Sequence, residues 1–372
     1  MKQTRKKRIA ITCQGGGSQT AFTAGVLQGL FAHDIDQSHD IVALTGTSGG
    51  AVNSVIAWYG MLKNADGDQT PVQQRIADFW NELKASSPME QLLDQINTFM
   101  IRASGAGHLP KLESSPSSHF SQMLQESASY LLPRKNYLDF KGLLESHINF
   151  KELPRLIKAH SPALFMGAAN VLNGKIRIFN SLSDKITVET VLASAAIPSV
   201  FPAVQIGDDY YWDGLFSSNP PISPVVRPVH MTNNVFPDEI WVVLIDPLCY
   251  NRIPTTPGDI LERRTQMTSN ISLVHDIEKI AILDRAIKAD GFKDSYLKER
   301  GLSNLAKLTF RLIRISDEAQ SALDYSSKLS RNPELIDMLM REGMQQVAAF
   351  MPTLKKPGAT PEQVLARITE SS

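Results

Sequence analysis

Residues 43–51 read ALTGTSGGA, an apolar run that leads into the pattern Gly-x-Ser-x-Gly and then into small residues. The apolar run predicts a strand, and the small residues that follow predict a helix. A sharp strand-to-helix turn holds its apex residue in strained backbone angles and projects a serine hydroxyl away from the sheet. Because Gly46 and Gly50 have no Cβ, the strand and the helix can approach closely. The stretch therefore predicts a nucleophile elbow with Ser48 at its apex, although a plain turn could carry the same letters.

A second glycine motif lies upstream and favours the catalytic interpretation. Residues 9–18 read IAITCQGGGS, again a strand that ends in glycines, and an apolar-periodic helix follows over 20–32. Glycines at such a turn expose backbone N–H groups, and the N-terminus of the helix adds partial positive charge. No Gly-Lys-Ser/Thr follows, so the loop is not a P-loop, and its spacing is not that of a dinucleotide fingerprint. Beside a serine elbow we interpret it as an oxyanion hole; tight packing of the turn is the alternative.

A candidate general base follows in the stretch DYYWDGL, residues 209–215. Asp213 ends a short aromatic strand, and Gly214 permits a turn just beyond it. A carboxylate there could accept the serine proton. An Asp with its ordinary pKa is a weak base at neutral pH, so burial or an apolar neighbour would have to raise that pKa. For an Asp considered alone, a turn or capping role is the alternative.

Taken together, these motifs resemble the patatin-like phospholipase family. That family has a glycine-rich oxyanion loop, a Gly-x-Ser-x-Gly elbow and a downstream Asp-Gly dipeptide in this order, and it uses a Ser-Asp dyad without histidine. Residues 192–203, LASAAIPSVFPA, resemble the family's segment just before the Asp, so the resemblance extends over residues 8–250. It implies three kinds of site group: the nucleophile Ser48, the base Asp213, and an oxyanion hole made by the backbone amides of Gly15, Gly16 and Gly17.

Departures from the family pattern bear on specificity. The family usually carries Arg or Lys two residues after the glycine triplet and then Gly, where this chain has Gln19 and Thr20. The positive charge near the oxyanion hole is therefore missing, which weakens the expectation of a phosphate head group. Leu215 stands where the family commonly has Gly or Ala after the Asp-Gly dipeptide. We expect this larger side chain to narrow the pocket locally.

The overall composition is typical of a soluble globular enzyme. The chain has 372 residues, of which 42% are hydrophobic, and its 38 basic and 38 acidic residues balance to a net charge of zero. This length permits a sizeable core, and the charge balance gives no sign of a nucleic-acid partner. Two cysteines make no disulfide framework, and without metal-ligand spacing we expect no metal or other cofactor. With no recognisable signal peptide or transmembrane segment, we expect a cytoplasmic protein with, at most, transient contact to a membrane surface.

Strands and helices alternate through much of the chain, which predicts an α/β three-layer sandwich, patatin-like, with a largely parallel sheet. Strands are expected over 8–13, 41–45, 163–169, 175–180, 203–212, 239–246 and 308–315. Helices are expected over 20–32, 49–63, 71–85, 118–131, 137–146, 187–196, 276–298 and 333–350. Residues 1–250 would form the catalytic domain, with an insertion or lid at 86–136. Residues 251–372 would form a helix-rich extension packed on the core.

The sequence thus predicts a serine lipid acyl hydrolase of the phospholipase A, lysophospholipase or esterase type, acting through an acyl-enzyme. Three alternatives stay open. An α/β-hydrolase with a Ser-Asp-His triad needs a late histidine, and only His230 and His275 follow Asp213. An acyltransferase of related fold would place His before the nucleophile, where Thr47 stands. A catalytically silent lipid-binding module would be free to lose either member of the dyad. The lipid class and the oligomeric state are not predicted.

Overall fold

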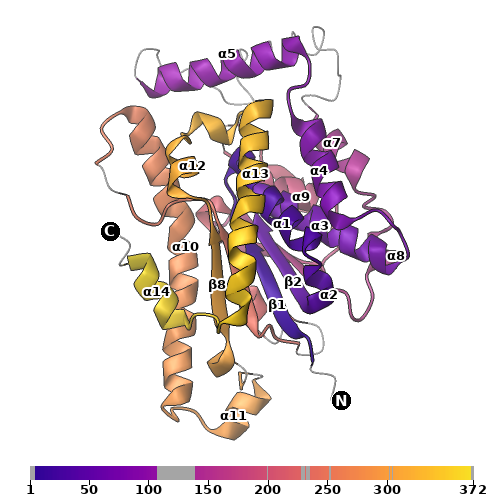
Figure 1. The fold of residues 1–372 in the computed structure, drawn as a ribbon, viewed down its shortest axis with the longest axis vertical. Coiled ribbons are helices and arrows are strands. Elements are labelled where there is room, and N and C mark those ends of the chain that lie inside the picture. The colour runs from indigo at the N-terminus through magenta and orange to yellow at the C-terminus, as the bar shows by residue number, and fades with distance from the viewer. Residues whose placement is uncertain are drawn as a thin grey trace.

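A mixed sheet of mainly parallel strands lies at the centre of the molecule, with helices on both faces (Figure 1). A computed structural model describes residues 5–106, 139–198, 200–227, 231, 235–250, 253–300, 302–303 and 305–369. Within these residues the strands are β1 (Lys7–Cys13), β2 (His39–Thr47), β3 (Ala163–Asn170), β4 (Ile176–Asn180), β5 (Val204–Ile206), β6 (Asp209–Asp213), β7 (Glu239–Leu244) and β8 (Thr309–Arg314).

The strand order is β5-β6-β3-β2-β1-β7-β8, and β4 pairs with β3. The five adjacent strands β3, β2, β1, β7 and β8 are parallel, whereas β4, β5 and β6 are paired antiparallel. Cys13 at the end of β1 pairs with Gly46 in β2, so the two glycine motifs emerge at the same edge of the sheet. This is the edge at which open α/β sheets place their binding sites.

Two of the longer helices, α10 (Pro257–Lys288) and α13 (Pro333–Phe350), begin on recognisable signals. Thr256 caps the first turn of one helix ahead of a proline, and Asn332 caps another in the same way. The helices are α1 (Ala21–Ala32), α2 (Ile35–Ser38), α3 (Gly49–Ala65), α4 (Val72–Leu83), α5 (Pro88–Gly105), α7 (Phe140–His147), α8 (Leu153–Leu156), α9 (Val188–Ala195), α10 (Pro257–Lys288), α11 (Asp294–Glu299), α12 (Asp317–Ser321), α13 (Pro333–Phe350) and α14 (Pro361–Thr369).

Alternate residues of the central strands enter two separate apolar cores, one on each face of the sheet. In β7, Trp241 and Val243 join the first core, and Ile240 and Val242 join the second. Helices α1, α3, α4, α9 and α13 complete the first core, and α10 and α14 complete the second. Because strand side chains alternate with a period of two, both faces of the sheet are buried, which confirms the predicted α/β architecture.

Helix α13 packs on α1 at unusually short range. Its buried positions follow one helical face: Ile336, Leu339, Met340, Gly343, Val347 and Phe350. A Cβ on Gly25 of α1 would overlap the backbone of Met340, and one on Gly343 would overlap the backbone of α1. The two glycines therefore permit backbone contact between helices that are more than 300 residues apart in the sequence.

Two predicted elements are wrong in their bounds. The strand expected over 203–212 is a hairpin, because Gly207, at φ 63°, makes a turn between β5 and β6. The helix expected over 276–298 begins much earlier, at Pro257, and ends at Lys288. Asp290 has φ 54°, and the Gly291 N–H donates back to the carbonyl of Ala286. These features end α10 before α11 begins.

The predicted insertion at 86–136 is described only in part. Its first section forms α5, which lies across one end of the molecule (Figure 1). The helix expected over 118–131 lies outside the described residues. Strand β8, from the C-terminal third of the chain, pairs with β7 and extends the sheet, so this third contributes to the sheet as well as to its helical cover.

Candidate active site

The turn between β2 and α3 carries Ser48 at its apex. Strand β2 ends at Thr47 and α3 begins at Gly49, so a single residue joins strand to helix. Its backbone angles, φ 57° and ψ −132°, are rare for a residue with a side chain and cost on the order of 1–3 kcal/mol. The Ser48 N–H donates to the backbone carbonyl of Ser194, at 3.0 Å, and to its hydroxyl, at 3.2 Å. These bonds from α9 help to hold the strained turn.

The two glycines of the elbow lie at its closest contacts. A Cβ on Gly46 would overlap the carbonyl of Gly50, and a Cβ on Gly50 would overlap the carbonyl of Cys13. Helix α3 therefore starts directly against the ends of β1 and β2. Ser48 retains 4% of its accessible surface, so a substrate acyl group would meet it in a largely desolvated setting.

The glycine triplet after β1 lies beside this serine. A Cβ on Gly15 would lie 2.7 Å from the Cβ of Ser48, so only glycine fits there. The Gly15 N–H donates to Oδ1 of Asn219 at 2.6 Å. This amide is therefore occupied, and the expectation that all three glycine amides face the substrate does not hold for Gly15.

The next two amides of the triplet remain open. Gly16 precedes, and Gly17 begins, a 3-10 turn, η1 (Gly17–Thr20), that leads into α1. No acceptor for the N–H of either residue is found among the residues that the structure describes. Gly17 has φ 57°, and a Cβ there would overlap the Lys328 carbonyl. Two adjacent open amides at the start of a helix suit a developing negative charge.

Asp213 ends β6, opposite Ala168 of β3, and its side chain is almost completely buried. Its N–H donates to the carbonyl of Ala196, at 2.9 Å, and its Oδ1 accepts the N–H of Leu215, at 2.8 Å. Its Oδ2 has no hydrogen-bond partner within the described part of the chain. One carboxylate oxygen is thus held in place while the other stays available.

Burial raises the pKa of Asp213 from 3.8 to about 7. The neighbouring Ser48 hydroxyl and the Leu215 amide oppose this rise because they stabilise the ionised form. The Ser48 hydroxyl is close enough to lower this pKa, although the two side chains do not meet ordinary hydrogen-bond geometry. The sequence required such a rise if Asp213 is to act as a base, and desolvation supplies it.

The residues at which the chain departs from the family pattern have structural partners. The Nε2 of Gln19 donates to the Asp324 carbonyl and to the Ser327 hydroxyl, so this side chain ties η1 to the 3-10 turn η8 (Ser326–Lys328). The Thr20 hydroxyl donates to the carbonyl of Gly17 at 2.6 Å. Leu215 is partly exposed beyond the base, and its N–H is the donor that holds Asp213.

A Ser-Asp-His triad would need one of the two histidines that follow Asp213 in the sequence. His275 is exposed on α10, and His230 lies outside the described residues. Across the described ranges, no histidine is hydrogen-bonded to Ser48 or Asp213. Within those same ranges, no three His, Cys, Asp or Glu side chains are grouped as metal ligands, and no helix is long and apolar enough to cross a membrane.

Four residues border the site for which the sequence predicted no role. Ser194 holds the elbow, Asn219 binds the Gly15 amide, Gln14 precedes the glycine triplet, and the Lys328 backbone lies against Gly17. The first three stand inside or beside the motifs quoted above, which was the available signal. Lys328 had none, because it meets the loop from more than 300 residues away.

Comparison with known proteins assigns the chain to a family. No curated protein sequence matches the chain significantly. Among solved structures, the chain is similar to VipD from Legionella pneumophila, with 13% identity over 94% of this chain and 67% of that chain, and a TM-score of 0.43. It is also similar to the type III effector protein ExoU, with 15% identity over 98% of this chain and 78% of that chain, and a TM-score of 0.27. The sequence model of patatin-like phospholipases matches residues 11–226, more than half of the chain, and this protein therefore belongs to the patatin-like phospholipase family.

Proposed function

We propose that this protein is a serine lipid acyl hydrolase that cleaves carboxylic esters through Ser48 and Asp213. Membership of the patatin-like phospholipase family supports a hydrolase that acts on lipids. The proposal that Ser48 and Asp213 act together rests on the buried Asp213 carboxyl. Its Oδ2 has no partner among the described residues, and its pKa is about 7. It lies near Ser48, which is held on a strained elbow. A base with a pKa near the working pH is the most effective one.

The reaction would proceed in two steps. The Ser48 Oγ attacks the ester carbonyl carbon while its proton passes to Oδ2 of Asp213, and the carbonyl electron pair moves to an oxyanion. The open amides of Gly16 and Gly17 would hold that oxyanion. When the C–O bond breaks, the leaving alcohol takes the proton from Asp213. Water then attacks the acyl-serine and gives a proton to Asp213. When the bond from the acyl carbon to Ser48 Oγ breaks, Asp213 returns this proton to Oγ, which releases the fatty acid and restores the Ser48 hydroxyl.

A panel of substrates with a nucleophile variant tests this proposal. Short p-nitrophenyl esters, phospholipid vesicles and triacylglycerol emulsions would be assayed with the wild type and with Ser48→Ala. We expect at least one ester to be hydrolysed and that activity to be lost in Ser48→Ala. Ser321→Ala removes an exposed hydroxyl on α12 and serves as the matched control. Equal activity in Ser48→Ala and the wild type would overturn the assignment.

We also propose that α5 contacts the lipid surface. Four apolar side chains lie along one face of this helix and are exposed: Met89 (37%), Leu92 (48%), Ile96 (50%) and Phe99 (66%). The opposite face is anchored, because Asp94 accepts hydrogen bonds from the Ser330 hydroxyl and the Arg331 N–H. An apolar stripe held outward on a surface helix is suited to the boundary between lipid head groups and acyl chains.

Vesicle flotation tests this contact. Burial of a large apolar side chain contributes about 1.5–3 kcal/mol, so the double variant Leu92→Ser/Phe99→Ser should lose at least about tenfold in vesicle binding. Its rate on a soluble ester should stay near the wild-type value. Gln95→Ser, an exposed polar position on the same helix, is the control. Unchanged flotation of the double variant would refute a role for this face.

A further inference from the structure

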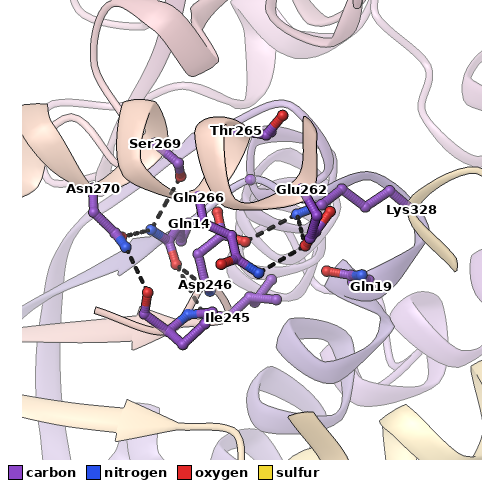
Figure 2. Close-up of polar contacts among 12 residues, drawn as sticks. Gln14, Gln19, Ile245, Asp246, Glu262, Thr265, Gln266, Ser269, Asn270 and Lys328 are labelled. Carbon is purple, nitrogen blue, oxygen red and sulfur yellow. Dashed lines mark hydrogen bonds and ion pairs between the residues drawn. The ribbon is translucent and has the colours of Figure 1, made fainter. Parts of the chain in front are cut away.

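Helix α10 lies beyond the part of the chain that matches the family, yet it turns buried polar side chains toward Gln14 and Lys328, which border the glycine loop (Figure 2). These positions follow one helical face: Glu262, Gln266, Ser269, Asn270 and Asp276. Buried polar groups are costly unless they find hydrogen-bond partners. The partners of this row therefore indicate what the helix holds in place.

Gln14, immediately before the glycine triplet, is one such partner. Its Oε1 accepts the backbone N–H groups of Ile245 and Asp246, at 2.8 and 2.9 Å. Its Nε2 donates to Oδ1 of Asn270, at 2.8 Å, and to Oγ of Ser269, at 3.3 Å (Figure 2). The side chain is fully buried, and both ends of its amide are satisfied. It ties the end of β1 to the end of β7 and to α10.

Asn219 is the second partner and reaches the triplet itself. It lies six residues after Asp213 and is completely buried. Its Oδ1 accepts the Gly15 N–H at 2.6 Å, and its Nδ2 donates to Oγ of Ser269 at 2.5 Å. Its own backbone N–H donates to Oγ of Ser272 at 2.9 Å. Asn219 thus connects the segment that carries the base, the glycine loop and α10.

The far end of the triplet is bounded by the C-terminal part of the chain. The Lys328 carbonyl lies against Gly17, and the Lys328 ammonium pairs with Oδ1 of Asp246 at 2.9 Å and with Oε1 of Glu262 at 3.5 Å (Figure 2). Because this cation is buried and paired with two carboxylates, it does not replace the basic residue missing at position 19. It fixes the turn against which Gly17 rests.

We propose that Asn219, anchored by Ser269 of α10, is a positioning residue that sets the direction of the open Gly16 and Gly17 amides. Three successive glycines have wide conformational freedom, so their own backbone does not select one orientation. Capture of the Gly15 N–H by Asn219 fixes the first peptide plane of the loop and thereby limits the next two. This inference rests on the proposed function, because it assigns these amides to the oxyanion.

Kinetics of Asn219→Ala test the proposal. Loss of an oxyanion donor costs about 10²–10³ in kcat, so loss of its alignment should lower kcat by about 10–100-fold. KM on a soluble p-nitrophenyl ester should change by less than about threefold, because ground-state binding does not depend on the oxyanion. The rate of labelling by a fluorophosphonate, which also forms an oxyanion at Ser48, should fall in parallel. A rise in KM without a fall in kcat would overturn the proposal.

A control variant on the same helix separates positioning from stability. Asp276 accepts hydrogen bonds from the N–H and the hydroxyl of Ser223 and does not contact the glycine loop. Asp276→Ala should lower thermal stability yet leave kcat within about twofold of the wild type. An equal fall in kcat for Asp276→Ala and Asn219→Ala would reduce Asn219 to a structural role and overturn the proposal.

Two further measurements make every outcome decisive. If Asn219→Ala does not fold, Ser269→Ala replaces it, because it removes the anchor and leaves the bond to Gly15. We expect a fall in kcat of about tenfold for Ser269→Ala, and a kcat equal to the wild type would refute the inference. Ser48→Ala is run in parallel. Activity that survives in Ser48→Ala contradicts the proposed function, whereas a dead Ser48→Ala with unaffected Asn219→Ala and Ser269→Ala contradicts only the inference.

Discussion

Replacement of Asp213 by Asn should lower activity strongly and, at alkaline pH, stabilise the protein. The carboxyl is buried with one oxygen unpartnered among described residues, and its pKa is about 7 against an ordinary value of 3.8. Asn keeps the size of the side chain and can still accept the Leu215 N–H, but it cannot take a proton from Ser48. We expect turnover to fall by about two to four orders of magnitude, the usual contribution of a positioned base.

The stability effect follows from the same pKa. Between pH 3.8 and about 7 the folded protein binds more protons at Asp213 than the unfolded chain does. The contribution of Asp213 to the free energy of unfolding is therefore fully present below pH 3.8. It falls as the pH rises through this window and stays reduced above it. At 1.36 kcal/mol for each pH unit, the full loss is about 4 kcal/mol. Because Asn carries no charge to bury, Asp213→Asn should exceed the wild type in stability at pH 8 by an amount that vanishes near pH 4.

Urea unfolding at pH 5 and pH 8 measures this difference, and a pH–rate profile on a soluble ester measures the base. The wild-type kcat/KM should fall about tenfold from pH 8 to pH 6, because about one tenth of a base with a pKa near 7 is ionised at pH 6. His275→Ala and His230→Ala are the controls and should keep most of the activity. A flat profile from pH 5.5 to 8.5, or a stability difference that does not grow with pH, would refute the assigned role of Asp213. A dead histidine variant beside an active Asp213→Asn would establish a triad instead.

Three further expectations follow from the geometry. A fluorophosphonate should label Ser48 stoichiometrically, and peptide mapping that finds the adduct on another serine would displace the elbow from its role. Because the proposed steps use only Ser48, Asp213 and backbone amides, EDTA should leave the rate on a soluble ester unchanged; a loss that calcium restores would contradict this. Gly25→Ala would place a methyl group in the backbone of Met340, so overpacking should lower the unfolding free energy by about 1–3 kcal/mol, and an unchanged urea midpoint would show that α13 can move away from α1.

Much of this protein is determined by local sequence. The strand-to-helix turns at residues 43–51 and 9–18 depend on glycines and apolar runs within a few positions, and the sequence predicted both. The helix expected over 333–350 is present as α13 for the same reason, since the helical period is a local property. The hairpin at Gly207 was missed because a glycine turn is also compatible with one longer strand. The start of α10 at Pro257 was missed because a proline at the first helical position is equally compatible with a linker.

Only the tertiary structure decided how the site is set. The pKa of Asp213 rises because packed elements remove water from its carboxyl. This desolvation cannot be predicted from the residues next to Asp213 in the sequence. The Gly15 amide is occupied by Asn219, 204 residues away, and this contact reduces the open amides of the triplet to two. The row of polar side chains on α10 looks like an imperfect amphipathic stripe until its partners are known. Local pattern selects which elements form, whereas hydrogen bonds and burial across hundreds of residues select which atoms remain free to act.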